Sequence, residues 1–229
     1  NALWKGVRLR DLLDMAGVKG QIRKVVLSAE DGYSDSITLD KAMDPGCLLA
    51  YEMNGVPLPK EHGFPARLLV PNIYGMKNVK WITKITLVDY DYRGYWQGNG
   101  WSDDATIVTM SRIDDSGPPD DIDLAPFGSG KLSADQQLVS GIAFAGERGV
   151  SQVEVSSDEG KTWSKALVKK ALSSNTWVLW VYPWTSPQKG DYTLRVRATD
   201  GRGGLQSAEE RDSLPDGASG YHEVVVQIT

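Results

Sequence analysis

One segment divides the chain into two halves with different patterns. Residues 113–131, IDDSGPPDDIDLAPFGSGK, are acidic, rich in proline and glycine, and lack both the helical and the strand repeat of apolar residues. Such a composition is typical of a linker between domains. A chain of 229 residues is long enough for two domains that each bury a core. We therefore predict two domains, residues 1–112 and 113–229.

The first half has the pattern of a mixed α+β domain. Apolar residues recur at helical spacing from Leu9 to Ala16, and Gly17 stands where a helix cap is expected. A helical turn is predicted at 39–45, and an Asn54-Gly55 turn is expected to follow a short strand. Further strands are predicted at 21–29, 66–71 and 78–90. In the last of these, alternation predicts one shared face for Trp81, Thr83, Ile85 and Leu87.

The second half reads as all-β. Short strand-like runs separated by turn residues occur at 137–146, 150–157, 162–170, 176–184, 191–200 and 222–229. This spacing favours a sandwich of the immunoglobulin type. The run SSDEGKTW at 156–163 matches an Asp-box, which occurs once rather than in a repeated series. We predict a hairpin there, with Asp158 and Gly160 in the turn and Trp163 packed beneath it.

Composition and motifs exclude several classes of function. A net charge of −5 argues against general nucleic-acid binding, and no apolar run approaches the roughly 20 residues of a membrane span. The chain lacks the G-x-S-x-G elbow, the P-loop and the G-x-G-x-x-G signature. Two distant histidines and a single cysteine make no recognisable metal set, and the apolar setting of Cys47 predicts a core residue. We expect His222 to have a structural role or to be merely exposed.

Cationic side chains gather in the segment 61–81, EHGFPARLLVPNIYGMKNVKW. It contains His62, Arg67, Lys77 and Lys80, and its glycines allow close approach of a ligand to the backbone. Arginine and lysine with free backbone amides suit a phosphate or another anion. A solvated basic strand edge accounts for the same spacing, and the residues alone leave both readings open.

A longer run carries a family resemblance. The segment 48–85, LLAYEMNGVPLPKEHGFPARLLVPNIYGMKNVKWITKI, resembles the pterin-binding core of the sulfite oxidase family of molybdenum oxidoreductases. The resemblance extends to LWKGVRLRDLLDMAGV and AEDGYSDSITLDKAM upstream and to YWQGNGWSDDATIVTMSRID downstream. The second half, from SGIAFAGERGVSQVEVSSDEGKTW to LPDGASGYHEVVVQ, is similar to the family's dimerisation domain. The resemblance thus implies a partial cofactor domain followed by an immunoglobulin-like dimerisation domain.

The resemblance also implies a cofactor and residues that hold it. The family's cofactor is a pyranopterin dithiolene that bears a phosphate and carries molybdenum on its two sulfurs. By transfer along the motif, His62 and Arg67 contact the pterin or its phosphate, Lys80 closes the phosphate site, and Lys77 is a secondary contact. Asp31 stands where the family has a pterin-binding acid. A buried phosphate dianion needs such donors to offset its desolvation.

Two positions depart from the family pattern. The family's molybdenum is also ligated by a cysteine upstream of this segment, and Cys47 is not at that position. We therefore expect no metal ligand in this chain, and we expect the cofactor in the full-length protein rather than in this chain alone. An active-site tyrosine of sulfite oxidases corresponds to Trp101, with Tyr95 as a less suitable substitute.

Expectations about substrate, partners and location follow from the resemblance. Sulfite is one substrate, and another small oxyanion or a sulfoxide is as compatible; the redox partner is unknown. We expect a homodimer through residues 113–229 and a location outside the cytoplasm, in the periplasm for a bacterial protein. The alternative is a non-catalytic β-rich binding or assembly module that retains the fold. The missing cysteine and the replaced tyrosine favour this alternative, whereas the intact set of His62, Arg67 and Lys80 argues against it.

Overall fold

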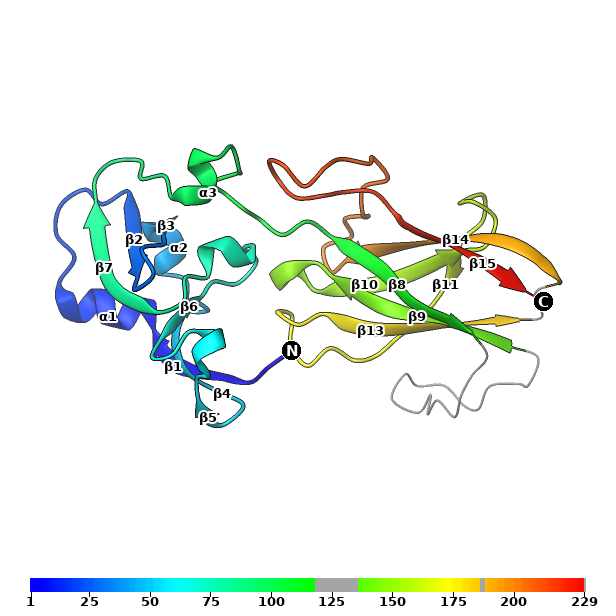
Figure 1. Ribbon diagram of the computed structural model, residues 1–229, viewed down its shortest axis with the longest axis horizontal. Helices are drawn as coiled ribbons and strands as arrows, with labels where there is room; N and C mark the ends of the chain where they lie inside the picture. The colour runs from blue at the N-terminus through cyan, green and yellow to red at the C-terminus, as the bar shows by residue number, and fades with distance from the viewer. Residues whose placement is uncertain (118–135, 186–187, 229) are drawn as a thin grey trace. The chain divides into compact units, whose positions relative to one another are not determined.

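The computed structural model describes residues 1–117, 136–185 and 188–228. The chain forms two compact units, each with its own core (Figure 1). Unit 1 contains residues 1–106 together with 214–216, and unit 2 contains residues 107–213 with 217–229. Residues 214–216 join unit 1 in part because the carbonyl of Pro215 accepts a hydrogen bond from the Ser102 amide. The division thus falls a few residues before the boundary expected from the linker, most of which lies outside the described residues.

Unit 1 contains two antiparallel sheets. The first has the order β3-β2-β7, with strands β2 Lys24–Ala29, β3 Ser34–Thr38 and β7 Ile82–Val88. In the second, β4 Leu48–Met53 is the common partner of β1 Trp4–Arg8, β5 Val56–Pro57 and β6 Arg67–Leu69. With its helices, the unit has the mixed α+β character predicted from its patterns.

Short helices connect these strands. The predicted first helix is confirmed as α1 Leu9–Ala16, and Gly17 caps it in the left-handed conformation with φ 70°. The other helical elements are α2 Leu39–Ala42, α3 Tyr95–Gly98 and the 3₁₀ turns η1 Lys60–His62 and η2 Gly75–Lys77. The predicted Asn54-Gly55 turn is also confirmed, because both residues have positive φ between β4 and β5.

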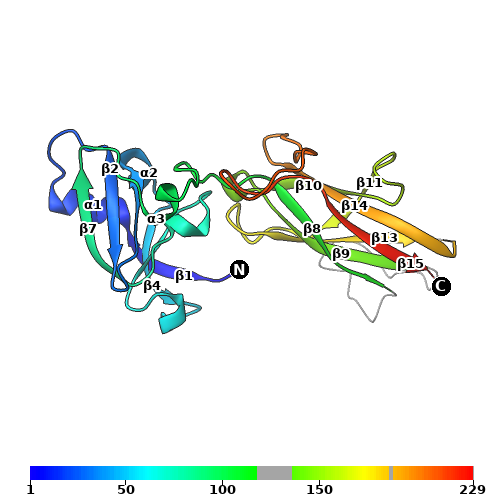
Figure 2. The same cartoon turned by 45° about the horizontal axis from the view of Figure 1, so that its top comes forward.

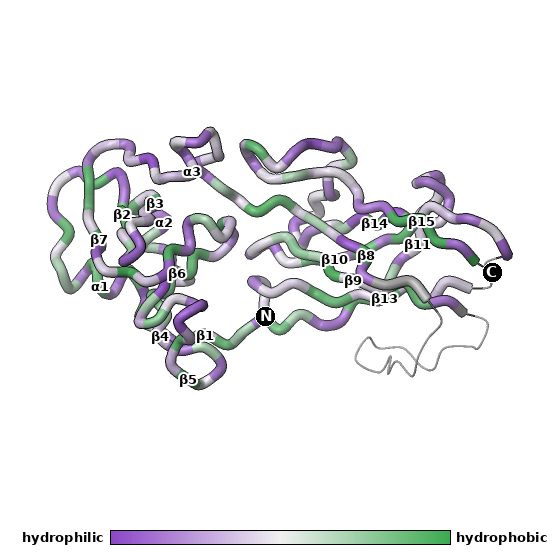
Figure 3. Tube along the Cα trace, in the orientation of Figure 1, coloured by the Kyte–Doolittle hydropathy of each residue, from purple (hydrophilic) through white to green (hydrophobic). Residues whose placement is uncertain are grey.

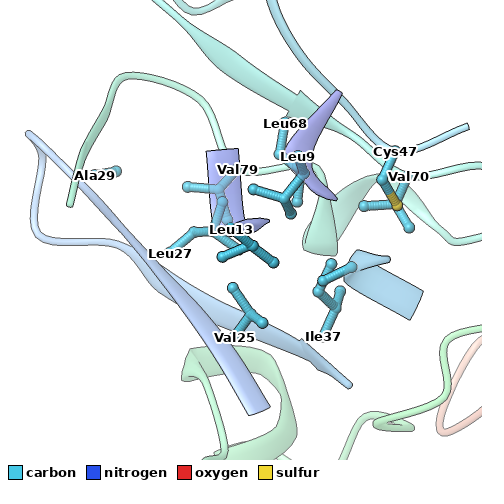
Figure 4. Close-up of a cluster of buried hydrophobic side chains, with 11 residues drawn as sticks. Leu9, Leu13, Val25, Leu27, Ala29, Ile37, Cys47, Leu68, Val70 and Val79 are labelled. Carbon is cyan, nitrogen blue, oxygen red and sulfur yellow. The ribbon is translucent and has the colours of Figure 1, made fainter. Parts of the chain in front are cut away.

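The core of unit 1 lies between α1 and the β3-β2-β7 sheet. Leu9 and Leu13, one helical turn apart on α1, are buried with Val25 and Leu27 of β2 (Figure 4). Figure 2 shows the course of α1 and β2 in the ribbon. Cys47 is fully buried in the same cluster, as its apolar setting predicted. The amphipathic spacing of the first helix is thus the pattern that buries it against the sheet.

A β-bulge changes the face of β7 expected from alternation. Leu87 pairs with Val25 and Ile85 with Leu27, but the register then shifts, so that Ile82 rather than Thr83 pairs opposite Ala29. Ile82 packs on the core, whereas Thr83 is exposed. The prediction that Thr83 shares the face of Ile85 and Leu87 was therefore wrong, because the extra residue at a bulge inverts the alternation beyond it.

The described part of unit 2 contains two four-stranded antiparallel sheets, and the larger of its hydrophobic clusters draws residues from both. The strand orders of the sheets are β11-β10-β14-β15 and β12-β13-β9-β8. Trp180, with no exposed surface, lies in this cluster with residues of both sheets, including Val139 of β9 and Leu194 of β14. The strands are β8 Met110–Gly117, β9 Gln136–Phe144, β10 Val150–Ser156, β11 Ser164–Lys165, β12 Leu167–Val168, β13 Val178–Thr185, β14 Gly190–Asp200 and β15 His222–Ile228.

The helical element in the described part of unit 2 is the 3₁₀ turn η4 Gly146–Arg148. The apolar residues of β15 appear in green along the tube near the C-terminus in Figure 3. Among these residues, Val224 and Val226 face the core, whereas Val225 is 72% exposed. The β-rich prediction for this half is confirmed.

The Asp-box forms the predicted turn between β10 and β11. The Asp158 carboxylate accepts hydrogen bonds from the amide and hydroxyl of Thr162, at 2.9 and 2.7 Å. Gly160 has φ 90°, and its carbonyl accepts a hydrogen bond from the indole of Trp163 at 3.1 Å. The motif is thus a local hairpin turn, stabilised by hydrogen bonds between its own residues.

Candidate functional site

Gly63 is the point at which three parts of the cationic segment meet. It follows η1 with φ 109°, and a Cβ added there would lie 3.0 Å from the Cβ atoms of both Arg67 and Lys80. Arg67 opens β6, and Lys80 lies just before β7. The absence of a side chain at Gly63 therefore lets two cations, one at the start of β6 and one before β7, approach the end of η1.

Arg67 is held in place but keeps one donor unpaired. Its guanidinium donates to the carbonyl of His62 at 3.2 Å and stacks over the ring of Trp4 at 5.2 Å. Its Nε is buried without a partner in the described part of the chain, where two other buried side-chain polar atoms, Gln97 Oε1 and Trp180 Nε1, share that condition. Burial lowers the pKa of Arg67. A buried unpaired N–H of a cation is costly, and an anionic ligand would satisfy it.

Lys80 and His62 are both close to the end of η1. The Lys80 ammonium donates to the carbonyl of Glu61 at 3.1 Å and lies 4.3 Å from the ring centre of Trp81. The imidazole of His62 is exposed at the end of η1. Three predicted site residues, His62, Arg67 and Lys80, are thus brought together.

Lys80 also lines a cavity of about 170 Å³ in unit 1. Asp31 lines the same cavity, so the predicted acid and the predicted phosphate-site lysine are both at this cavity. The Asp31 carboxylate accepts a hydrogen bond from the Tyr33 amide at 3.0 Å and is exposed. The other lining residues include Tyr33, Met76, Trp81 and Trp96. This mixture of aromatic walls, one acid and one cation suits a flat polar heterocycle.

Lys77 has a different position from the one expected for a secondary ligand contact. It is 2% exposed, and its ammonium donates to the Asp35 carboxylate at 3.1 Å, the Ser36 carbonyl at 2.8 Å and the Asp103 carboxylate at 2.8 Å. All three ammonium protons are therefore used inside the protein. The spacing of the motif did not reveal this, because Asp35 and Asp103 are distant from Lys77 in sequence.

Trp101 lies beside the cavity wall. Its ring packs edge-on against Trp96, with ring centres 5.9 Å apart, and its amide donates to the Trp96 carbonyl at 3.1 Å. Sequence reasoning considered Trp101 and Tyr95 but missed Trp96, Tyr33 and Trp81 as lining residues. The aromatic residues of YWQGNGW were the sequence signal that could have pointed to Trp96.

The remaining candidates have structural settings. Burial raises the pKa of the Cys47 thiol to about 12, and the thiol donates to the Lys41 carbonyl. His222 Nδ1 accepts a hydrogen bond from the Ile113 amide at 3.2 Å. In the described ranges, no group of three or more His, Cys, Asp or Glu residues is arranged to hold a metal ion. Over the same ranges, no helix has the length and apolar character needed to cross a membrane.

Comparison with known proteins shows which families and proteins this chain resembles. Residues 1–96 match the family model described as the oxidoreductase molybdopterin binding domain, and residues 127–228 match the Mo-co oxidoreductase dimerisation domain. The chain is 32% identical to the mitochondrial sulfite oxidase of Drosophila melanogaster, over the whole chain and 45% of the relative. It is 29% identical to the sulfite oxidase of Arabidopsis thaliana, over 90% of the chain and 61% of the relative.

A solved structure has the same fold over nearly the whole chain. The sulfane dehydrogenase SoxCD from Paracoccus pantotrophus superposes with a TM-score of 0.78 and 25% identity, over 99% of this chain and 60% of the other. The chain thus spans about half of the length of these relatives. The two matched domains, their order and the full-length relatives agree with the motif at 48–85: the chain belongs to the sulfite oxidase family of molybdopterin-dependent oxidoreductases.

Proposed function

We propose that unit 1 binds the phosphate-bearing pyranopterin of a molybdenum cofactor, as part of a sulfite oxidase-like oxidoreductase. The observation that carries this proposal is the buried, unpaired Nε of Arg67 beside Lys80 at Gly63. These donors fit a phosphate: the guanidinium offers a fixed fork of N–H groups and the ammonium a point charge. Molybdenum, when bound, supplies the redox and oxygen-atom-transfer chemistry.

The chain's own residues would bind and orient this cofactor. Arg67, pre-set by its stacking on Trp4, would pair its unpaired Nε with the phosphate. Lys80 would close the same site, and exposed His62 would donate at its rim. Asp31, on the cavity wall, would accept from the N–H groups of the pterin. Lys77 has no such role, because its ammonium is committed to internal carboxylates.

For the substrate we propose a small sulfur oxyanion such as sulfite. The support is the naming of the relatives as sulfite oxidases and as a sulfane dehydrogenase. At the place of the family tyrosine, Trp101 offers an indole N–H but no phenolic hydroxyl. We therefore propose that proton transfer by a phenol at this position is not part of the reaction of this protein.

We propose a homodimer built through residues 113–229, with unit 2 as an immunoglobulin-type sandwich. Support comes from the match to a dimerisation domain and from the two packed four-stranded sheets. Analytical ultracentrifugation at about 10–50 μM, within the range of ordinary homodimer affinities, is expected to show the dimer. A monomer throughout that range would contradict the proposal.

The cofactor proposal is tested in the full-length protein by Arg67→Ala and Arg67→Lys, with Arg202→Ala as a control. The Arg202 side chain belongs to unit 2 and is 71% exposed, so its loss removes the same charge and leaves the described contacts of Arg67 in unit 1 intact. Molybdenum content and the fluorescence of the oxidised pterin are measured after purification. We expect Arg67→Ala to lose most of both, Arg67→Lys to retain an intermediate amount, and Arg202→Ala to match the wild type. Full retention in Arg67→Ala would overturn the proposal.

The similarity to enzymes over both units favours catalysis over a purely adhesive module. For the location, we propose a site outside the cytoplasm, which cell fractionation of the parent protein tests. Recovery of the parent protein in the cytoplasmic fraction would contradict it.

A further inference from the structure

A single lysine connects the two ends of the loop that carries α3. Lys24 of β2 is 5% exposed, and its ammonium lies 3.7 Å from the Asp91 carboxylate before α3. The same ammonium donates to the Asp103 carboxylate after α3. The loop from Asp91 to Asp103 is therefore closed at its base by one cation, on a strand of the core sheet.

The closure continues into a buried cluster of charges. Asp103 also accepts from Lys77, which in turn donates to Asp35 of β3. Asp35 is fully buried, and the Tyr33 hydroxyl lies 3.0 Å from its carboxylate. Burial opposes the ionisation of Asp103, but hydrogen bonds from Lys24 and Lys77 outweigh it and lower the pKa of Asp103. The cluster thus links β2, β3, η2 and the loop by opposite charges.

The first part of the loop lies directly on β3. The Tyr92 hydroxyl is 2.6 Å from the Ser34 hydroxyl, and the Tyr92 carbonyl accepts from the Ser36 hydroxyl at 3.0 Å. Gly94 is buried, and a Cβ added there would lie 2.6 Å from the Ser34 carbonyl oxygen. Beyond this contact, Trp96 reaches the wall of the cavity, and Trp101 packs against it.

Stability alone is a weak reason for such a cluster. Buried ion pairs commonly contribute little more than apolar residues of the same size, whereas they fix one arrangement of the groups that they join. Here the joined groups are the core sheet and the loop that supplies an aromatic wall of the cavity. The cluster is therefore suited to setting the position of Trp96 and Trp101.

We propose that Lys24 and Asp103 are positioning residues, which hold the loop 91–103 so that Trp96 forms the cavity wall and Trp101 stands behind it. The loop-holding part rests on the contacts in unit 1 alone. Its consequence for catalysis rests on the proposed function, in which the cavity and its surroundings belong to the cofactor and substrate region.

The loop-holding part is tested by hydrogen exchange in the 229-residue chain. The variants are Lys24→Met, the conservative Lys24→Arg and Asp103→Asn, with Lys5→Met as a control that breaks an exposed Lys5–Glu52 pair at 3.0 Å. We expect amides of residues 94–103 to exchange about ten-fold faster or more in Lys24→Met and Asp103→Asn, as for a locally opened segment. Lys24→Arg should stay near the wild type, and Lys5→Met should not change.

Two results of the hydrogen-exchange experiment would contradict the proposal. Wild-type exchange of residues 94–103 in both Lys24→Met and Asp103→Asn would overturn the proposal. Faster exchange throughout β2 and β7 would do so as well, since it would show a general role in folding. Asp103 is partly exposed, so Asp103→Asn keeps the test decisive if Lys24→Met fails to fold.

The catalytic consequence is tested by steady-state kinetics of the cofactor-loaded parent protein, with sulfite as the probe. We expect Lys24→Met to lower kcat/KM, expressed per molybdenum bound, about ten-fold or more, as for a misplaced wall of a reaction site. Lys24→Arg should restore most of the loss. Unchanged kcat/KM together with faster loop exchange would overturn the catalytic part. If wild-type parent does not oxidise sulfite, the substrate proposal fails, and the exchange result still decides whether Lys24 and Asp103 hold the loop.

Discussion

The guanidinium of Arg67 lies over the indole of Trp4, 5.2 Å from the ring centre, so that β1 and β6 meet across the face of β4 at this pair. Stacking leaves the edge of the guanidinium available for hydrogen bonds. Trp4 is therefore a support for the residue that we assign to the phosphate.

This pair can be measured by a double-mutant cycle. We expect Trp4→Ala, Arg67→Met and the double variant to reveal a coupling of about 0.5–2 kcal/mol in the free energy of unfolding, the range of a partly buried cation–π contact. Urea denaturation followed by circular dichroism gives the four values. Strict additivity would show that the stacking contributes no stability.

Gly63→Ala is expected to destabilise unit 1 by about 1–3 kcal/mol, because a side chain at φ 109° is strained and would press on Arg67 and Lys80. The matched control is Gly98→Ala, where φ is ordinary and a new Cβ meets no atom within 4 Å. Thermal unfolding of the two variants should separate them. A Gly63→Ala variant as stable as Gly98→Ala would contradict the tight convergence at Gly63.

The Asp-box predicts a pH dependence of the stability of unit 2. Hydrogen bonds from the Thr162 amide and hydroxyl and from Ser156 lower the pKa of Asp158 from 3.8 to about 2. Because the folded pKa is the lower one, the carboxylate stabilises the fold above pH 3.8, and this contribution is lost as the pH falls towards 2.

Comparison of the wild type with Asp158→Asn tests the direction of this pH dependence of stability. We expect the stability difference between them to shrink between pH 4 and pH 2, with Asp212→Asn as a control for the loss of one exposed carboxylate. A difference that stays constant over this range would show that the depressed pKa of Asp158 has no part in stability.

Cys47 is expected to be unreactive in the folded chain. Burial raises the pKa of its thiol to about 12, and thiol reagents react with the thiolate. At pH 8, a disulfide reagent should label the native chain far more slowly than the chain in guanidinium chloride. Rapid stoichiometric labelling without denaturant would contradict the buried position.

Local signals predicted much of the fold. Gly17 ended a helix and Asn54-Gly55 made a turn, because the conformation of such residues is decided within a few neighbours. The Asp-box turn followed the same rule. The bulge opposite Ala29 was not predictable, since it depends on how two distant strands pair, and a single extra residue inverted the expected face of Thr83.

The site shows the same division. His62, Arg67 and Lys80 were predicted from one continuous motif, and the structure brings them together around Gly63. Lys77 was expected, by transfer from the family resemblance, to be a secondary contact of the ligand, but Asp35 and Asp103 from other parts of the chain accept hydrogen bonds from it. Contacts over such long sequence separations leave no periodic signal.

The bulge in the β3-β2-β7 sheet also makes the position of Lys80 sensitive to the length of β7. Lys80 stands two residues before Ile82, whose placement in the core depends on that one extra residue of β7. A deletion or insertion within β7 would slide the apolar set off the core and rotate Lys80 away from Gly63 in the same step. A change of length inside β7 would therefore disturb the core of unit 1 and the convergence of Arg67 and Lys80 at Gly63 together.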